Sequence, residues 1–426
     1  MRVLYPCCAA IDVHKDTVMV DVRCAEPGAD TSSEVREFGT MTRDLLALSD
    51  WLTERGVTHV AMESTGVYWK PIWNVLEASF QLLLVNAQHV KHVPGRKTDV
   101  QDCQWLAELL QSGLLKGSFV PPRPLRELRD LTRYRTKLVQ DKTRAVNRLQ
   151  KVLEDANLKL GSVASDVLGV SGRAMLERII AGEQDPVVLA DLAQRALRAK
   201  IPQLQQALYG HVTEHHRFLL AELYDEVRQL EARIQRITAR IERALSGGEL
   251  EAASEDPDAL PFEAAVQLLT TIPGVQTAIA EVIVSEIGTD MSRFPTADHL
   301  ASWAGVAPGN HESAGKRRRT KTPPGNRWLR GALTQAAWAA SRSKGTYLSA
   351  QFRRLAGRRG AKRAIVATGH SILEAAYHML ATGQPYADLG PNHFDQLHPE
   401  RLARYLVKRL ERLGYSVALT YASEAA

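Results

Sequence analysis

The order of apolar runs in the first 115 residues constrains the fold more than any other feature of this sequence. Apolar runs at 8–13 and 17–22 are separated by three polar residues, which predicts an antiparallel hairpin. A third short strand is expected at 35–38, after a loop rich in glycine, serine and aspartate. The chain therefore begins with three consecutive strands.

Helical and strand-like runs alternate after this point. Helices are predicted at 42–55, 67–78 and 99–110, and strands at 58–62 and 81–85 separate them. The resulting βββ-α-β-α-β-α order is that of a ribonuclease-H-like fold, in which helices cover both faces of a mixed sheet. We therefore expect residues 1–118 to form an α/β domain of this kind.

Four acidic residues lie at the ends of these predicted elements. Asp12 is near the end of the first strand, and Glu63 follows the fourth. Asp99 and Asp102 open a helix and, three positions apart, share one of its faces. If the strands pair as predicted, the four carboxylates meet at one sheet edge, where they would repel one another unless a divalent cation lay between them. This pattern indicates a two-metal phosphodiester site that binds Mg²⁺ or Mn²⁺.

Each acid taken alone also has an ordinary explanation. Asp12 could be a solvated acid at a fraying strand end, and acids at a helix start are favoured by the helix dipole. The loop before Asp99 adds a separate observation, because Arg96 and Lys97 make it basic and suited to hold a phosphate.

Residues 119–248 are predicted to be helical, between a proline-rich linker and a Gly247-Gly248 linker. Apolar residues recur every three or four positions from Leu219 to Leu245. This spacing predicts an antiparallel helical hairpin or a coiled coil between protomers, with a core-facing helix as the plain alternative.

Residues 262–385 are predicted to form a mainly helical C-terminal domain, followed by a tail, 386–426, to which we assign no role. The Pro273-Gly274 turn resembles a helix-hairpin-helix element, in which Gly274 would let the backbone approach a phosphate. An ordinary turn between helices is an equally good interpretation.

Positive charge is concentrated in this last domain. The chain as a whole has a net charge of +6 and a pI of about 9.1. The residues that we expect to contact nucleic acid here are Lys316, Arg317, Arg318, Arg319, Lys321, Arg327 and Arg330. Ser313 precedes this run in a polar loop flanked by glycines, which would expose its hydroxyl beside a bound phosphate. By itself, such a serine is more often an ordinary surface residue.

The composition is that of a soluble globular protein, with 45% hydrophobic and 24% charged residues. No apolar run approaches the roughly 20 residues that span a bilayer, so no membrane partner is expected. The N-terminal residues do not read as a signal peptide. The four cysteines lack metal-ligand spacing, and we expect them to be buried, reduced thiols of a cytoplasmic protein.

These residues together resemble a known family. The segments Ile11-Asp12-Val13-His14-Lys15, Met62-Glu63-Ser64-Thr65-Gly66-Val67-Tyr68 and Lys97-Thr98-Asp99-Val100-Gln101-Asp102 are similar to the acidic motifs of DEDD insertion-sequence transposases of the IS110 type. Gly305-Val306-Ala307-Pro308, Ser313-Ala314-Gly315 and Gly325-Asn326-Arg327-Trp328-Leu329-Arg330 resemble the C-terminal motif of that family. Family members usually have Ser-Gly where this chain has Ser313-Ala314-Gly315. Piv DNA invertases are relatives.

The resemblance implies a RuvC-like N-terminal domain, a coiled-coil linker and a C-terminal domain bearing a catalytic serine. On this basis Asp12, Glu63, Asp99 and Asp102 hold the metal, and Ser313 attacks the scissile phosphate. The partners implied are DNA, as element ends and target, and a structured guide (bridge) RNA encoded by the element. We expect a homodimer or tetramer in the bacterial cytoplasm, associated with the nucleoid.

Two other functions are compatible with parts of the pattern. A RuvC-like junction resolvase would use the four acids and a metal-activated water, without a serine. A non-catalytic nucleic-acid-binding protein would need the basic residues alone.

Overall fold

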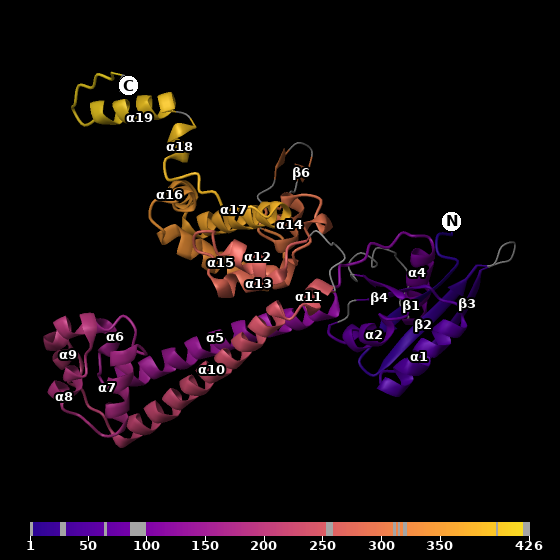
Figure 1. Cartoon of the computed structure of the whole chain (residues 1–426), viewed down its shortest axis with the longest axis horizontal. Helices are drawn as coiled ribbons and strands as arrows, with labels where there is room; N and C mark the ends of the chain where they lie inside the picture. Colours follow the sequence, from indigo (N-terminus) through magenta and orange to yellow (C-terminus); the bar gives the residue numbers. More distant parts are fainter. Residues whose placement is uncertain are drawn as a thin grey trace. The chain divides into compact units, whose positions relative to one another are not determined.

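The computed structural model describes residues 3–25, 31–63, 66–85, 99–252, 259–309, 312–313, 316–317, 322–397 and 399–420. For residues 99, 251, 312, 313, 316 and 317 it describes the backbone alone. The chain divides into two compact units, Met1–Pro121 and Pro122–Ala426 (Figure 1).

The first unit contains a mixed five-stranded sheet. Its strands are β1 (Cys7–Val13), β2 (Thr17–Cys24), β3 (Ser32–Gly39), β4 (His59–Glu63) and β5 (Gln81–Val85). In space they follow the order β3-β2-β1-β4-β5. β1, β2 and β3 pair antiparallel, whereas β1, β4 and β5 pair parallel. The predicted hairpin and the α/β class of this region are confirmed.

Helices cover both faces of this sheet. Alternate residues of a strand point to opposite faces, so β1 contributes to two separate cores. Ala9, Ile11 and Val13 belong to the core that also includes residues of α1 (Thr42–Glu54) and α2 (Trp69–Leu76). Cys8 and Ala10 pack instead with residues of α4 (Asp99–Gln111). All three helices begin and end within two residues of the predicted bounds.

The cysteines differ from the expectation. Cys7 and Cys24 face each other across β1 and β2, with their Cα atoms 4.1 Å apart, and their sulfurs are bonded. The prediction of four reduced thiols is therefore wrong for this pair. Cys8 and Cys103 are free and buried, as expected.

The second unit begins with a long antiparallel pair of helices, α5 (Arg123–Asp155) and α10 (Glu214–Ser246), which lie side by side in Figure 1. Leu138 and Ala145 of α5 pack with Val227 and Leu230 of α10. Of the two arrangements predicted for the apolar stripe, the structure has the hairpin within one chain.

Short helices pack at the far end of this hairpin around a core that also includes Leu149 of α5 and Leu220 of α10. They are α6 (Leu160–Val163), α7 (Val170–Ile180), α8 (Pro186–Asp191), η1 (Arg195–Lys200) and α9 (Ile201–Ala207).

The rest of the second unit is almost entirely helical. Its helices are α11 (Glu249–Ala252), α12 (Phe262–Leu269), α13 (Thr277–Ile287), η2 (Met291–Arg293), α14 (Ala297–Ala304), α15 (Arg327–Arg342), α16 (Tyr347–Arg359), α17 (Ala361–Thr382), α18 (His393–Gln396) and α19 (Pro399–Glu411). Leu125 and Ile241, from the base of the long hairpin, share one core with these helices. The predicted division between a linker domain and a C-terminal domain stays a prediction. No helix in the described ranges has both the length and the apolar character that crossing a membrane requires.

Candidate active site

Asp12 and Glu63 lie at the same edge of the sheet. β1 and β4 pair in parallel with Ile11 opposite Met62, so the next residue of each strand is an acid at the carboxyl end of the pair. Asp12 points to the same face as Ala10, and Glu63 to the same face as Ala61, because side chains two positions apart in a strand share a face. That is the face covered by α4. Both acidic side chains are partly buried.

The start of α4 lies over this edge. The Cys103 thiol donates to the carbonyl oxygens of Ala10 and Met19, each 3.2 Å away, and Met19 is the partner of Asp12 in β2. Burial raises the pKa of this thiol to about 12, so it remains a neutral donor. Asp102 directly precedes Cys103 and is exposed, and Asp99 is the first residue of the helix. The structure thus brings together the three elements that carry the four predicted acids.

A histidine that the sequence analysis left without a role lies beside the first acid. His14 Nε2 is 3.2 Å from Asp12 Oδ2, and half of the histidine side chain is exposed. In the sequence, His14 is marked only by its position two residues after Asp12, in the turn of a predicted hairpin. Histidines in such positions are too common to indicate a function.

The donors at this edge suit a hard divalent cation, because carboxylate oxygens are the ligands that Mg²⁺ prefers. Among the side chains that the structure describes, no group of three or more His, Cys, Asp or Glu residues is arranged to hold a metal ion. The side chain of Asp99 is outside that set. In chemical type the residues fit Mg²⁺, and the assignment of these four ligands stays a prediction.

A fifth acid on the same face escaped the sequence analysis. Asp21 of β2 lies opposite Ala10 and is fully buried. Ser33 Oγ donates to Asp21 Oδ1 at 2.7 Å, whereas Asp21 Oδ2 has no hydrogen-bond partner in the described structure. Burial raises the pKa of this carboxyl group, with partial opposition from Ser33 and Arg23. The alternating pattern of β2 could not reveal that Asp21 is buried, since the sequence of the strand does not show which elements cover each face of the sheet.

We expect Asp21→Asn to stabilise the first unit at neutral pH, by about 1–2 kcal/mol, because the substitution removes a poorly compensated buried charge. The raised pKa means that the folded state holds the proton more tightly than the unfolded state. The stability of the natural protein therefore falls as pH rises from the unfolded pKa through the folded one. The advantage of Asp21→Asn should accordingly vanish near pH 4, close to the unfolded pKa of about 3.9.

Urea unfolding in the presence of a metal chelator, at pH 7 and at pH 4, measures this difference. Asp16→Asn serves as the control, because Asp16 is an exposed acid in the β1–β2 turn. Destabilisation by Asp21→Asn at pH 7 would show that the buried carboxylate has a favourable partner.

Ser313 belongs to a hairpin in the second unit rather than to an open loop. β6 (Glu312–Ser313) pairs antiparallel with β7 (Lys316–Arg317), and Ser313 lies opposite Lys316. Ser313 is therefore the last residue of β6, and its partner in β7 is a basic residue.

The two ends of the segment that contains this hairpin, Gly305 and Gly325, are in close backbone contact. Gly305 follows α14 with φ +71°, and Gly325 precedes α15. A Cβ atom on Gly325 would lie 2.4 Å from Gly305 N, and one on Gly305 would lie 2.8 Å from Gly325 Cα. Only glycine fits at both positions. We refer to residues 305–325 as the serine loop.

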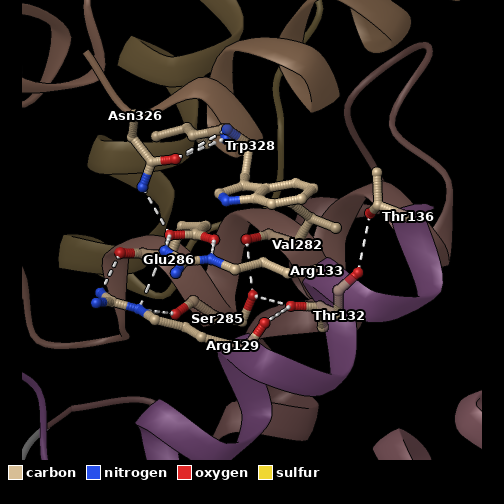
Figure 2. A network of polar contacts seen from close by, with 10 residues as sticks. Arg129, Thr132, Arg133, Thr136, Val282, Ser285, Glu286, Asn326 and Trp328 are labelled. Atoms are coloured by element: carbon tan, nitrogen blue, oxygen red, sulfur yellow. Dashed lines mark hydrogen bonds and ion pairs between the residues drawn. The ribbon is translucent and has the colours of Figure 1, made fainter. Parts of the chain in front are cut away.

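A buried polar network holds the C-terminal end of the serine loop (Figure 2). Asn326 caps α15, since its Oδ1 accepts from the backbone amides of Trp328 and Leu329. Its Nδ2 donates to Glu286 Oε2 of α13 at 2.6 Å. Glu286 is fully buried and accepts two hydrogen bonds from Arg133 of α5, each 2.7 Å long. The start of α15 is thereby fixed to both α13 and α5.

Arg129 completes the network in Figure 2. Its Nε donates to the carbonyl oxygen of Ser285 at 2.7 Å and lies 3.9 Å from Glu286 Oε2. Burial lowers the pKa of the Arg129 guanidinium to about 10, and Glu286 opposes that shift. Arg129 therefore remains charged at neutral pH, and Glu286 lies beside two guanidinium groups.

The predicted nucleic-acid contacts are described in part. Arg327 stacks over the Trp328 ring, 4.7 Å from its centroid. Gly274 has φ +90°, and a Cβ atom there would lie 2.4 Å from the Ala336 carbonyl oxygen, so packing against α15 already explains this glycine. Its predicted contact with phosphate stays a prediction. The predicted residues outside the described ranges are Arg96, Lys97, Arg318, Arg319 and Lys321.

Two transposase family models match the chain. A model described as "Transposase", for DEDD proteins of the IS110 type, matches residues 9–158. A second, described as "Transposase IS116/IS110/IS902 family", matches residues 266–353. The first match contains the β1–β4 edge and α4, and the second contains the serine loop.

Two relatives agree with these matches. The chain is 26% identical to a "Probable family 20 transposase" of Pseudomonas aeruginosa over 302 residues, which is 70% of this chain and 75% of the relative. It is 41% identical to an "Insertion element IS110 uncharacterized 43.6 kDa protein" of Streptomyces coelicolor over 73 residues, which is 17% of this chain and 18% of the relative.

Proposed function

The chain belongs to the IS110 family of transposases, and we propose that it excises and inserts its own element through a transient phosphoserine–DNA link. DNA transposition is the activity of this family, so DNA is the substrate. The observation that carries the mechanistic proposal is the placement of Asp12 and Glu63 at one edge of the sheet, beneath the start of α4. The sheet order β3-β2-β1-β4-β5, with helices on both faces, supports a ribonuclease-H-like, RuvC-like domain.

In this proposal Asp12, Glu63, Asp99 and Asp102 hold Mg²⁺ or Mn²⁺, which when bound neutralises phosphoryl oxygens and acidifies a nearby hydroxyl group. The Ser313 hydroxyl group gives its proton to water, and its Oγ bonds to the phosphorus atom. The bond from phosphorus to a deoxyribose oxygen breaks, and that oxygen takes up a proton from water and leaves as a DNA hydroxyl group. The serine phosphodiester retains the energy of the broken bond, so a second DNA hydroxyl group can displace Ser313 and rejoin the strands.

The basic residues have a separate role in this scheme. Lys316 to Arg319, together with Lys321, Arg327 and Arg330, would neutralise phosphates beside the serine, and Arg96 and Lys97 would do the same beside the acids. We further propose that a structured bridge RNA selects the DNA and that the active form is a homodimer or tetramer. Sequencing of RNA that co-purifies with the protein, and the mass of the assembled complex, test these two points.

Trapping of a covalent protein–DNA adduct tests the serine directly. Labelled DNA that contains the element ends is incubated with the protein and Mg²⁺, denatured, and separated by size. We expect an adduct with the natural protein, none after metal chelation, and none with Ser313→Ala. Ser302→Ala is the matched control, because Ser302 is an exposed serine of α14 in the same unit.

The possible outcomes separate the three functions. Cleavage without an adduct, unchanged in Ser313→Ala, would identify a hydrolytic resolvase. DNA binding that neither metal nor Asp12 influences, with no cleavage, would identify a binding protein.

A further inference from the structure

A pocket of about 1170 Å³ lies in the second unit, next to both ends of the serine loop. Val306 and Pro308 line it from the N-terminal end of that loop, and Thr322 and Pro324 from the C-terminal end. The remaining wall comes from α15, α16 and α17. This volume is somewhat larger than the roughly 300–1,000 Å³ typical of pockets for small organic ligands. Neither the proposed chemistry nor the family matches assign it a ligand.

Three cationic side chains surround this pocket. Arg330 of α15, and Lys362 and Arg363 of α17, contribute to its lining, to which no acidic residue of the described structure contributes. These three residues also have no ion-pair partner in the described ranges. Lys362 and Arg363 lie in the first turn of α17, where the helix dipole is already positive and no acid is present. Like charges are thus held together around an open space, which favours an anionic ligand.

The rest of the pocket wall is mostly apolar. Pro308, Pro324, Val366 and Ala367 give it an apolar surface beside the cations. Two lining residues also have a buried polar atom with no hydrogen-bond partner in the described structure, His370 Nδ1 and Gln351 Oε1. Buried polar atoms are normally satisfied, so they indicate a ligand that also brings hydrogen-bonding groups.

A nucleotide combines these three properties, since it has a flat apolar base, polar base edges and a charged phosphate. We propose that the pocket binds one unstacked nucleotide of the strand held beside the serine loop. Its base contacts Val366 and Ala367, and its phosphate lies at Arg330, Lys362 and Arg363. The identification of that strand rests on the proposed function, whereas nucleotide binding itself rests on the pocket.

The first test compares two pairs of basic residues. The full-length protein is titrated with a single-stranded DNA of about 12 nucleotides, close to the length that such grooves bind. The double variant Lys362→Ala/Arg363→Ala should bind about tenfold more weakly at low salt, and the salt dependence of log K should fall by about 0.7 to 1.4. The control Arg358→Ala/Arg359→Ala removes the same charge from exposed positions of α16 outside the pocket. Equal losses in both variants would indicate a general basic surface and overturn the proposal.

The second test narrows the pocket at the proposed base contact without changing its charge. The oligonucleotide carries 2-aminopurine, whose fluorescence rises when the base leaves its stacked neighbours. Binding to the natural protein should raise this fluorescence, and Ala367→Trp should abolish the rise while the affinity stays within about threefold, because phosphate contacts dominate affinity. An unchanged signal in a folded Ala367→Trp protein contradicts the proposal. If that variant fails to fold, the smaller substitution Ala367→Leu and the comparison of the two double variants still test the proposal.

The same titrations with RNA of identical sequence distinguish the source of the nucleotide. A larger signal with DNA assigns the pocket to the strand being cut, and a larger signal with RNA assigns it to the guide. Repeating them with Ser313→Ala separates this inference from the proposed function. Nucleotide binding should persist in that variant. If the natural protein forms no serine–DNA adduct, nucleotide binding by the pocket still stands. If the pocket binds no nucleotide, the adduct experiment still tests the role of Ser313.

Discussion

Asp12→Asn is expected to lower the rate of DNA strand cleavage about a thousandfold or more, which corresponds to roughly 4 kcal/mol of transition-state stabilisation. The substitution keeps the size of the side chain and removes its charge. Asp12 and Glu63 lie side by side at the carboxyl ends of two parallel strands, so this change removes half of the negative charge that the strands contribute there. A cation at this edge would be held less tightly and positioned less well.

The measurement is single-turnover cleavage of labelled DNA at saturating Mg²⁺, with DNA affinity determined separately. Affinity should stay close to that of the natural protein, since Asp12 does not belong to the basic surface. Asp16→Asn, four residues away in the same hairpin and exposed, should cleave at the natural rate. If Asp12→Asn retains cleavage within tenfold of the natural protein, the acidic edge is not the catalytic site.

Glu286→Ala is expected to destabilise the second unit by about 3–5 kcal/mol, the usual cost of removing one partner from a buried ion pair. Glu286 is fully buried and is the carboxylate closest to Arg133 and Arg129 in the network of Figure 2. Without it the charged guanidinium group of Arg129, which is only 12% exposed, loses its carboxylate partner. Asn326 also loses the acceptor of its Nδ2 group, which leaves a second polar group unpaired.

Urea unfolding followed by far-ultraviolet circular dichroism measures this loss, because the second unit contains most of the helices. Glu231→Ala is the control, since Glu231 also pairs with two cations, Arg173 and Lys142, but at about one-quarter exposure. Partly solvated pairs contribute little, so its loss should be about 1 kcal/mol or less. If the two substitutions lower the free energy of unfolding equally, the burial of Glu286 does not determine how much its ion pairs stabilise the protein.

The destabilised variant also addresses function. The network holds Asn326, and the adjacent Gly325 closes the serine loop against Gly305. Any Glu286→Ala protein that remains folded should therefore form the covalent adduct more slowly, with its acidic edge unchanged.

Local patterns in the sequence were enough to predict the elements of the first unit. The strands 7–13, 17–24 and 59–63 and the helix 99–111 agree closely with the predicted ranges, because strand and helix periodicities depend on residues near in sequence. The adjacency of Asp12 and Glu63 also followed, since parallel strands that end in an acid meet at one edge.

Contacts between distant residues could not be predicted in this way. The apolar stripe on α10 was compatible with a partner helix in the same chain or in another protomer. Its packing against α5 shows that the partner is in the same chain. The hydrogen bonds of Glu286 join residues 153 and 40 positions away, and no local pattern encodes such separations. His14 and Asp21 became notable only through their neighbours.

The sequence by itself determined which acids end which elements, where the basic residues gather and which family the motifs resemble. The tertiary structure decided that the long helices form a hairpin within one chain, that two glycines close the serine loop, and that a cationic pocket lies beside it. The physical reason is that periodicity and charge are properties of neighbouring residues, whereas burial, close backbone approach and cavities depend on segments that only folding brings together.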